Sequence, residues 1–345
     1  MTDEPATPPA SYPAGGLRLP GWVRLAILAA LAVLAGWYLL THREDFAILA
    51  EVDAGPLLLA AAVNGLVYVS GALVVRAVVR PFHIRIGWIE AIHLALLTRF
   101  GNVFLPFRGG MGLRAAYLSR AHGLPLSRFV AGLAGTMMAS MFVSSLVALG
   151  GLAWAWGRSG GVSWWAAGGL TGFCVSVVAL AVWRPQIRSR GPAVWRAVAA
   201  VLDGWHELCE HRRTLAAVVG AAALQVCALA GVYALLLADM GVDASWPAVV
   251  TVIAAGNVST LIMITPGSIG VYEAAIAALA GAVGVSPPAI LAAAVVWRAL
   301  DTGFILLSGG AAGIALTRGL RRPGGGRKSD ETGPLAPLDH SEKHV

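Results

Sequence analysis

The sequence predicts an all-α polytopic membrane protein, with about six full transmembrane helices and two broken helical hairpins arranged as an inverted repeat. The first observation is composition: 57% of the 345 residues are hydrophobic, 12% are charged, and the mean hydropathy is +0.73. Soluble domains carry about twice that share of charge. The second is a series of apolar stretches of bilayer-spanning length. The third is a pair of longer apolar regions that Pro and Gly interrupt.

The full spans are predicted by six apolar stretches, at residues 24–40, 56–79, 129–152, 163–183, 214–238 and 287–316. They belong to a membrane domain at 21–317, between tails at 1–20 and 318–345 that are predicted to be disordered. No small-x-small cleavage site follows the first stretch, so we interpret it as an uncleaved span. Apolar residues recur at helical spacing over about 190–213, which predicts a cytoplasmic amphipathic helix lying on the membrane.

Two apolar regions, 87–120 and 247–283, are too long for one crossing, and each is broken near its middle. The breaks are LPFRGGMG (105–112) and TPGSIG (265–270). The arginines form four groups that the positive-inside rule assigns to the cytoplasm, together with both termini. That assignment requires each broken region to leave the membrane on the side where it enters. Each region is therefore a hairpin, either re-entrant or crossing fully twice.

The hairpins and their flanking spans form two similar units, at about 56–152 and 214–316, which start on opposite sides of the membrane. This is the inverted-repeat plan of many secondary transporters. In both breaks a Gly follows a Pro by four residues, and both hairpins carry the sequence GNV, at 101–103 and 256–258. The sequence likeness between the units is otherwise weak.

The two breaks are candidate ligand sites. A helix broken at membrane depth leaves backbone groups that only protein or a water-filled cavity can satisfy. The helix that begins after such a break directs free N–H groups and the positive end of its dipole at a ligand, which favours an anion. Pro106 and Pro266 are the candidate hinges. The glycines that would let the backbone approach a ligand closely are Gly109, Gly110, Gly267 and Gly270. The alternative is a tight loop at the membrane surface.

Charged residues stand at both breaks and in the last span, namely Arg108, Arg114, Glu273, Arg298 and Asp301. A charge at the centre of a span costs roughly 2.5–3.5 kcal/mol, so we expect these side chains to face inward. Arg298 and Asp301 could form a structural ion pair at i and i+3. Alternatively, Arg298 holds a phosphate that Asp301 or Glu273 helps to orient. Proton coupling by Glu273 and snorkelling of Arg114 to the interface are further alternatives.

The segments LPFRGGMGLRAAYL, TPGSIGVYEAA and VVWRALDTGF resemble the flippase-like membrane domain of lysylphosphatidylglycerol synthases, a family with stand-alone members that lack the synthase domain. The resemblance covers roughly residues 20–317. The family motifs P-x-R-x-G-[DE]-x-x-R and P-G-G-x-G-x-R-E, and an Arg in the last span, map onto Pro106, Arg108, Gly110, Arg114, Pro266, Gly267, Gly270, Glu273 and Arg298.

The chain departs from these motifs at three positions. Met111 replaces the acid of the first motif, Tyr272 replaces the arginine of the second, and Ser268 replaces a glycine. One acid is missing from the first motif and one base from the second. An ion pair that would join the two hairpins in other family members could therefore be absent from this chain. The resemblance implies binding and transbilayer movement of lipids with charged headgroups.

The predicted function is that of a lipid translocase in a bacterial inner membrane, which binds an anionic, phosphate-bearing headgroup between two inverted hairpins. No enzyme activity, cofactor, metal site or nucleic-acid partner is expected. One alternative is a membrane enzyme acting on a lipid-linked phosphate or sugar, and another is a non-transporting partner of a lipid-modifying enzyme. GxxxG spacing permits a homo-oligomer at Gly168/Gly172 and at Gly309/Gly313.

Overall fold

The computed structural model describes residues 52–82, 84–104, 109–159, 164–183, 193–260 and 270–319. All regular secondary structure in these ranges is helical, as predicted. The elements are α3 (Ala54–Val79), η2 (Arg80–Phe82), α4 (Trp88–Phe104), α5 (Gly109–His122), α6 (Leu126–Ser159), α7 (Trp164–Trp183), α8 (Ala193–Glu210), α9 (Arg212–Asp239), α10 (Trp246–Ser259), α11 (Val271–Ala280), η5 (Gly281–Val283) and α12 (Pro287–Gly319).

Four helices, α3, α6, α9 and α12, are long and apolar enough to cross a membrane. They confirm four of the six predicted full spans. The predicted span at 163–183 is α7, whose described apolar stretch, Trp164–Leu180, is shorter than the other four. The predicted span at 24–40 and the tail at 1–20 lie outside the described residues, as does nearly all of the tail at 318–345.

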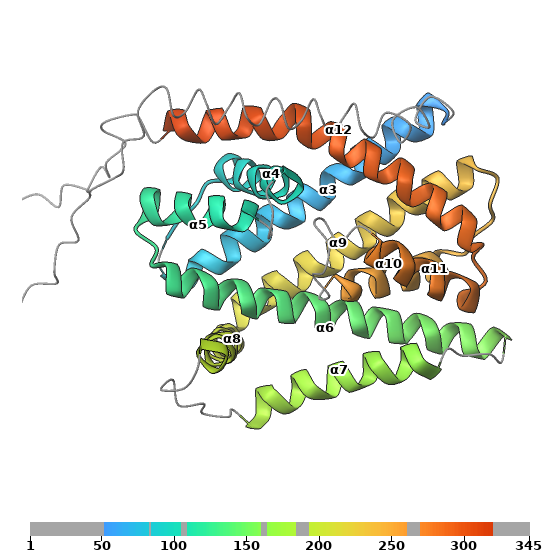
Figure 1. The fold of residues 1–345 in the computed structure, drawn as a ribbon, viewed down its shortest axis with the longest axis horizontal. Coiled ribbons are helices and arrows are strands. Elements are labelled where there is room, and N and C mark those ends of the chain that lie inside the picture. The colour runs from blue at the N-terminus through green and yellow to red at the C-terminus, as the bar shows by residue number, and fades with distance from the viewer. Residues whose placement is uncertain are drawn as a thin grey trace, which may run out of the picture.

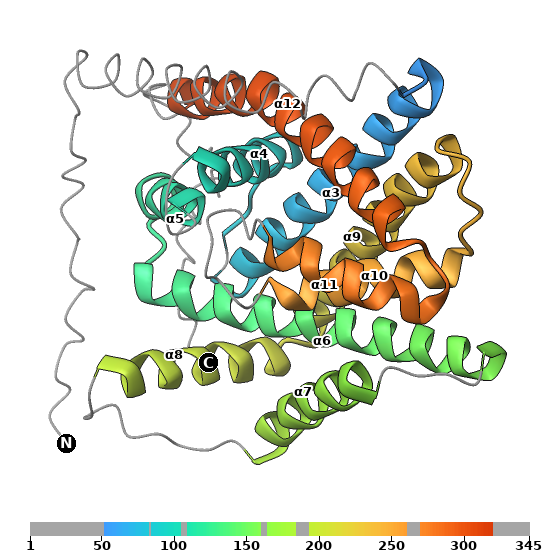
Figure 2. The same ribbon diagram turned by 45° about the vertical axis from the view of Figure 1, so that its right-hand side comes forward.

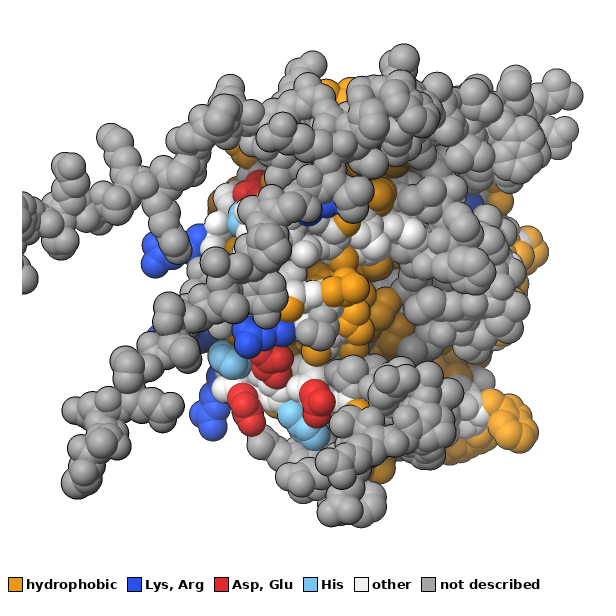
Figure 3. Space-filling model, turned by 60° about the vertical axis from the view of Figure 1, so that its left-hand side comes forward, with side chains coloured by type: hydrophobic (Ala, Val, Ile, Leu, Met, Phe, Trp, Pro, Cys, Tyr) orange, Lys and Arg blue, Asp and Glu red, His pale blue; other side chains and the backbone are white. Residues whose placement is uncertain are grey.

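The two ends of the long helices differ in charge. Figures 1 and 2 place the last residues of α3 and α12 at the same end of the molecule as the first residues of α6 and α9. Charged and histidine side chains gather at this end in Figure 3. The described arginines that belong to it are Arg76, Arg80, Arg85, Arg120, Arg128, Arg212 and Arg213. We call this region the arginine-rich end.

Both broken apolar regions form pairs of packed helices, α4 with α5 and α10 with α11. Figure 1 shows the first pair toward the arginine-rich end and the second toward the opposite end. The glycines of the two GNV sequences lie where the paired helices touch. A Cβ on Gly101 would lie 2.5 Å from Gly110 Cα, and one on Gly256 would lie 2.7 Å from the ring of Tyr272. Only glycine permits approaches this close.

The helices of the two units pack in a regular order. The first spans, α3 and α9, lie along each other, while α12 packs against α4 and α6 packs against α10. The largest apolar core lies between these elements, with Tyr233, Ile253, Ile276 and Ile290 completely buried. Helices surrounded by lipid gain little from hydrophobic burial, so close packing of this kind supplies much of their association energy.

The amphipathic segment predicted at about 190–213 contains the helix α8, and the described part of its apolar face packs on protein. Its position on the membrane surface stays a prediction. Trp205 and Leu208 are buried against neighbouring helices. A Cβ on Gly204 would lie only 1.8 Å from the Ala131 carbonyl oxygen, so the backbones of α8 and α6 are in contact. Packing inside the chain therefore accounts for the described part of the apolar stripe, which includes Leu202, Trp205 and Leu208.

The two GxxxG pairs have different surroundings. Gly309 and Gly313 of α12 face Phe100 and Leu97 of α4, so this pair serves a contact within the chain. For Gly168 and Gly172 of α7, no atom of another element in the described part of the chain lies within 4 Å of an added Cβ. The spacing at Gly309/Gly313 thus reflects the packing of α12 on the first hairpin.

Candidate functional site

Arg298 and Asp301 lie one turn apart in α12, and each side chain contacts a different hairpin. The guanidinium of Arg298 donates a short hydrogen bond to Glu273 Oε1 of α11. The carboxylate of Asp301 lies 3.6 Å from Nη1 of Arg99 in α4. The ion pair considered between Arg298 and Asp301 is therefore not the arrangement observed. Instead, α12 is joined to both hairpins by adjacent pairs of opposite charge.

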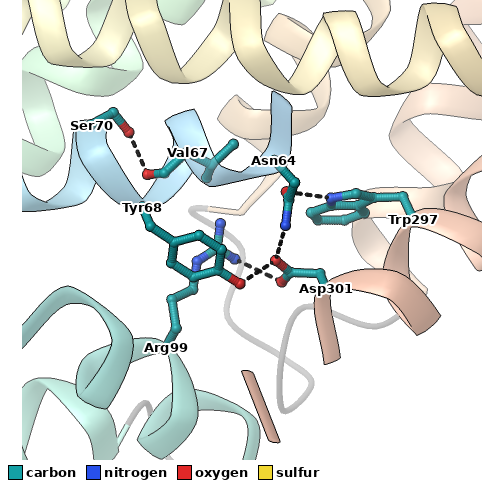
Figure 4. A network of polar contacts seen from close by, with 7 residues as sticks. All are labelled: Asn64, Val67, Tyr68, Ser70, Arg99, Trp297 and Asp301. Carbon is teal, nitrogen blue, oxygen red and sulfur yellow. Dashed lines mark hydrogen bonds and ion pairs between the residues drawn. The ribbon is translucent and has the colours of Figure 1, made fainter. Parts of the chain in front are cut away.

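The carboxylate of Asp301 is the centre of a buried polar network that also includes α3 (Figure 4). Tyr68 Oη and Asn64 Nδ2 both donate to Asp301 Oδ1, at 2.6 and 2.9 Å. Trp297 Nε1 donates to Asn64 Oδ1 at 3.2 Å. Asp301 and Asn64 are 6% and 1% exposed. A buried charge is tolerated when it is paired and hydrogen-bonded, and Asp301 has both kinds of partner.

Three members of this network, Arg99, Asn64 and Tyr68, were missed by the sequence analysis. Arg99 interrupts the apolar run LALLTRFG of α4, and an ionisable residue at membrane depth is itself a signal of a functional or paired group. Asn64 and Tyr68 stand at i and i+4 in the apolar helix α3, so they share one face. The guanidinium of Arg99 also lies 5.9 Å from the ring of Tyr68, and one third of its side chain is accessible.

Glu273 has a second role at the start of α11. The backbone of Gly270 has φ +86°, a left-handed conformation that glycine adopts without strain. Its N–H donates to Glu273 Oε2 at 2.7 Å, as in a capping box. One carboxylate thus caps α11 and pairs with Arg298 of α12. The predicted ligand-binding N–H of Gly270 is already occupied by this bond.

An aromatic group lies beside the Arg298–Glu273 pair. The ring of Trp297 lies 5.8 Å from that of Tyr233 and 6.1 Å from that of Tyr272, centroid to centroid. Both tyrosine hydroxyls are buried and lie close to each other, but within the described part of the chain neither forms a hydrogen bond of normal geometry. Buried polar groups are normally paired, so these two donors need an explanation. An oxygen-bearing ligand or ordered water beside Arg298 would supply it.

The other predicted site residues that the structure describes, Arg114, Gly109 and Gly110, do not join this centre. Arg114 is buried at 6% exposure, and its guanidinium lies 5.7 Å from the ring of Phe129 in α6, so it does not snorkel to the interface. Gly109 is the first residue of α5. A Cβ on Gly110 would lie 1.8 Å from the Thr98 carbonyl oxygen, so this glycine serves helix packing. The remaining predicted residues lie outside the described ranges, namely Pro106, Arg108, Pro266 and Gly267.

These observations define a class: a multi-pass helical membrane protein in which two helix pairs meet one span at a charged, largely buried centre. Residues 21–309 match the family model described as lysylphosphatidylglycerol synthase TM region. The chain belongs to this family, which confirms the resemblance found in the motifs. The same comparisons found no match among curated proteins or among solved structures.

Proposed function

We propose that the chain is a lipid translocase of the bacterial inner membrane that binds a phosphate-bearing headgroup at the centre of α12 and performs no covalent step. The observation that carries the proposal is the pairing of Arg298 and Asp301 with Glu273 and Arg99, which come from opposite hairpins. Ionisable groups between transmembrane helices are costly and commonly mark substrate pathways. We place the arginine-rich end and both termini in the cytoplasm, following the positive-inside rule.

The packing order supports an inverted repeat of α3–α6 and α9–α12. If the two units are related by a pseudo-twofold axis in the membrane plane, contacts must occur in equivalent pairs. The first spans α3 and α9 pack on each other, and the last span of each unit packs on the first hairpin helix of the other. Secondary transporters built this way bind substrate at the repeat interface near the bilayer midplane. In this chain that interface includes Arg298 and Asp301.

Arg298 is the group best suited to contact the phosphate. A guanidinium presents five N–H donors in a planar fork that matches phosphate oxygens. Glu273 bonds to one terminal nitrogen, and the side chains of Arg298 and Glu273 are 23% and 22% accessible. A phosphate would compete with Glu273 for this fork. The hydroxyls of Tyr233 and Tyr272 could then donate to the remaining headgroup oxygens.

This competition would couple the headgroup to the position of the second hairpin. Glu273 joins α11 to α12, so a phosphate that takes over Arg298 weakens that connection. The carboxylate would keep its bond to the Gly270 N–H and continue to cap α11. Helix α11 would then be free to move relative to α12 only while a headgroup is bound. Such a change is what alternating access requires.

The test is lipid movement in proteoliposomes. Fluorescent phosphatidylglycerol is incorporated into phosphatidylcholine vesicles, and the loss of fluorescence after adding a membrane-impermeant quencher reports transfer between leaflets. We expect the wild type to exceed protein-free vesicles and Arg298→Gln to be slower by about tenfold or more, because a charge-assisted contact contributes about 1.5–3 kcal/mol. The matched control is Arg212→Gln, the same change at an exposed position in the first turn of α9.

Equal movement by the wild type and Arg298→Gln, at equal reconstitution, would contradict the site. Movement no faster than in protein-free vesicles would contradict the function. Phosphate or sugar released from a lipid would favour the enzyme alternative. A partner that co-purifies with an inactive protein would favour the accessory role.

A further inference from the structure

A second basic site lies at the arginine-rich end, apart from the centre of α12. A cavity of about 540 Å³ opens where α3 ends and the chain turns toward α4. Its described lining consists of Arg76, Arg80, Ile84, Arg85 and Ile86. Arg76 is eight residues beyond Tyr68, which is roughly 12 Å further along the axis of α3. The cavity is therefore distinct from the polar network around Asp301.

Within the described part of the chain, no acidic side chain compensates the charges that line this cavity. Its described lining includes three arginines and no acidic residue. Within the described ranges, none of the three guanidinium groups forms an ion pair. Arg76 is held in place by Trp88, whose ring centroid lies 4.1 Å from the guanidinium carbon. Three cations that line one cavity repel each other, and a bound anion would remove this repulsion.

The surroundings point to an amphipathic anion rather than a soluble one. Ile84 and Ile86 line the same cavity as the arginines. Next to it, at the start of α4, Trp88 is 47% exposed and Ile89 is 74% exposed. Trp beside Arg at the end of a membrane span is typical of the lipid headgroup region. A soluble phosphate would use the arginines but leave the apolar groups without a role.

We propose that this cavity binds the phosphate of an anionic membrane lipid, with Arg76, Arg80 and Arg85 around the phosphate and Trp88 and Ile89 against the glycerol and upper acyl region. Juxtamembrane arginines attract anionic lipids, and a guanidinium fork matches phosphate oxygens. The site lies at one face of the membrane and holds a lipid there without moving it. The proposal does not rest on the translocation function.

The experiment uses full-length protein in phosphatidylcholine nanodiscs that contain a small fraction of diazirine-bearing phosphatidylglycerol. After illumination, labelled peptides are mapped by mass spectrometry. We expect labelling within residues 76–89 to fall about tenfold or more in the variant Arg80→Gln/Arg85→Gln, because each juxtamembrane arginine contributes several-fold in affinity. Both residues are exposed, so the fold is expected to survive. Arg212→Gln/Arg213→Gln removes the same charge at the same end and should label like the wild type.

Three outcomes would overturn the proposal. The first is equal loss of labelling in both double variants, which would indicate general attraction of anionic lipid to a basic surface. The second is unchanged labelling in Arg80→Gln/Arg85→Gln. The third is full competition by millimolar glycerol 3-phosphate, which would assign the cavity to a soluble phosphate. A phosphatidylcholine analogue should label this region weakly.

The result can be separated from the test of translocation. Arg298→Gln should keep the labelling within 76–89, because Arg298 lies in the centre of α12 and not in this cavity. Loss of lipid movement with intact labelling would support both proposals. Arg298→Gln could lose lipid movement while the wild type shows no specific labelling of the cavity. That result would overturn only the proposal that the cavity binds a lipid.

Discussion

The two hairpins are joined to α12 by the same kind of contact but in different surroundings. In the first, Arg99 of α4 pairs with Asp301, whose carboxylate also accepts hydrogen bonds from two residues of α3. In the second, Glu273 of α11 pairs with Arg298, and within the described ranges its other carboxylate oxygen bonds to the start of its own helix. Through polar contacts the first hairpin is thus linked to α12 and, by the approach of Arg99 to the Tyr68 ring, to α3. Within the described ranges the second hairpin has, beside its apolar packing, one ion pair to α12, which a ligand can replace.

The contacts between the paired helices also indicate that the first hairpin is the more rigid. In the first, Gly110 lies against the backbone of α4, which cannot yield. In the second, Gly256 lies against the side chains of Ile276 and Tyr272, which can rotate. The comparison indicates a fixed first hairpin and an adjustable second one. Each of the following predictions tests whether this difference is real.

The largest effect is expected from removing the carboxylate of Asp301. Asp301→Ala leaves Arg99, Asn64 and Tyr68 without their shared acceptor, and breaking a buried pair costs about 3–5 kcal/mol. Glu273→Ala removes a cap and a partly exposed pair, so about 1–2 kcal/mol is expected. Denaturant unfolding in detergent measures the loss of unfolding free energy in both variants. Equal losses would contradict the difference between the hairpins.

The next largest effect is expected when a glycine between the paired helices is replaced by alanine, and it should differ between the two hairpins. Gly110→Ala places a Cβ 1.8 Å from the Thr98 carbonyl oxygen, and overpacking against backbone is expected to cost about 3 kcal/mol. Gly256→Ala meets movable side chains and should cost about 1 kcal/mol. Gly112→Ala is the control, because among the described residues no atom of another element lies within 4 Å of its added Cβ. The yield of monodisperse protein and its thermal unfolding distinguish the three. A greater loss in Gly256→Ala would reverse the comparison.

The glycines also illustrate how far the sequence could be interpreted. Close approach to the backbone was predicted for the glycines at the breaks, and it is found at Gly110, whereas nothing in the described part of the chain lies within 4 Å of an added Cβ on Gly270. The sequence could not indicate whether a ligand or another helix makes such an approach, and for Gly110 it is the carbonyl of Thr98. The spans α3, α6, α9 and α12 were predictable because length and apolar character alone decide them.

The polar centre was predictable only in part. Glu273, Arg298 and Asp301 were identified because charges in apolar segments are rare and must face inward. Their partners could not be assigned, because Tyr68 and Asp301 are 233 positions apart and meet only after α3 packs beside α12. Local spacing favoured Arg298 with Asp301, but the tertiary structure supplies each with a partner from a different hairpin.

A smaller effect is expected when single hydroxyls are removed near the two ion pairs. Tyr68→Phe removes a 2.6 Å hydrogen bond to a carboxylate and should cost about 1.5–3 kcal/mol. Tyr272→Phe removes a hydroxyl that forms no hydrogen bond of normal geometry in the described part of the chain, so its stability should stay within about 0.5 kcal/mol of the wild type. Tyr272→Phe should instead slow lipid movement. A destabilised Tyr272→Phe with normal movement would exclude this hydroxyl from the headgroup site.

The smallest effect on stability depends on pH and concerns the contact between the start of α4 and the helix α5. Glu90, in the first turn of α4, accepts hydrogen bonds from His122 Nε2 at 2.7 Å and from Tyr117 Oη at 2.8 Å, both in α5. The bond with His122, more than that with Tyr117, lowers the pKa of Glu90 below its usual value, although burial opposes this shift. A carboxylate with a lowered pKa stabilises the folded state above its ordinary pKa, and this stability is lost as the pH falls through the folded value.

Thermal unfolding in detergent should therefore show a modest loss for the wild type between pH 7 and about pH 4, where an ordinary Glu begins to protonate. Glu90→Gln cannot titrate at this position, so its loss over the same range should be smaller. Asp203→Asn, at an exposed position of α8, should behave like the wild type. Identical pH dependence in Glu90→Gln and the wild type would show that this pair does not hold α4 to α5. The helices α4 and α5 would then be held together by apolar packing and the glycine contact without a polar link, which would narrow the difference between the two hairpins.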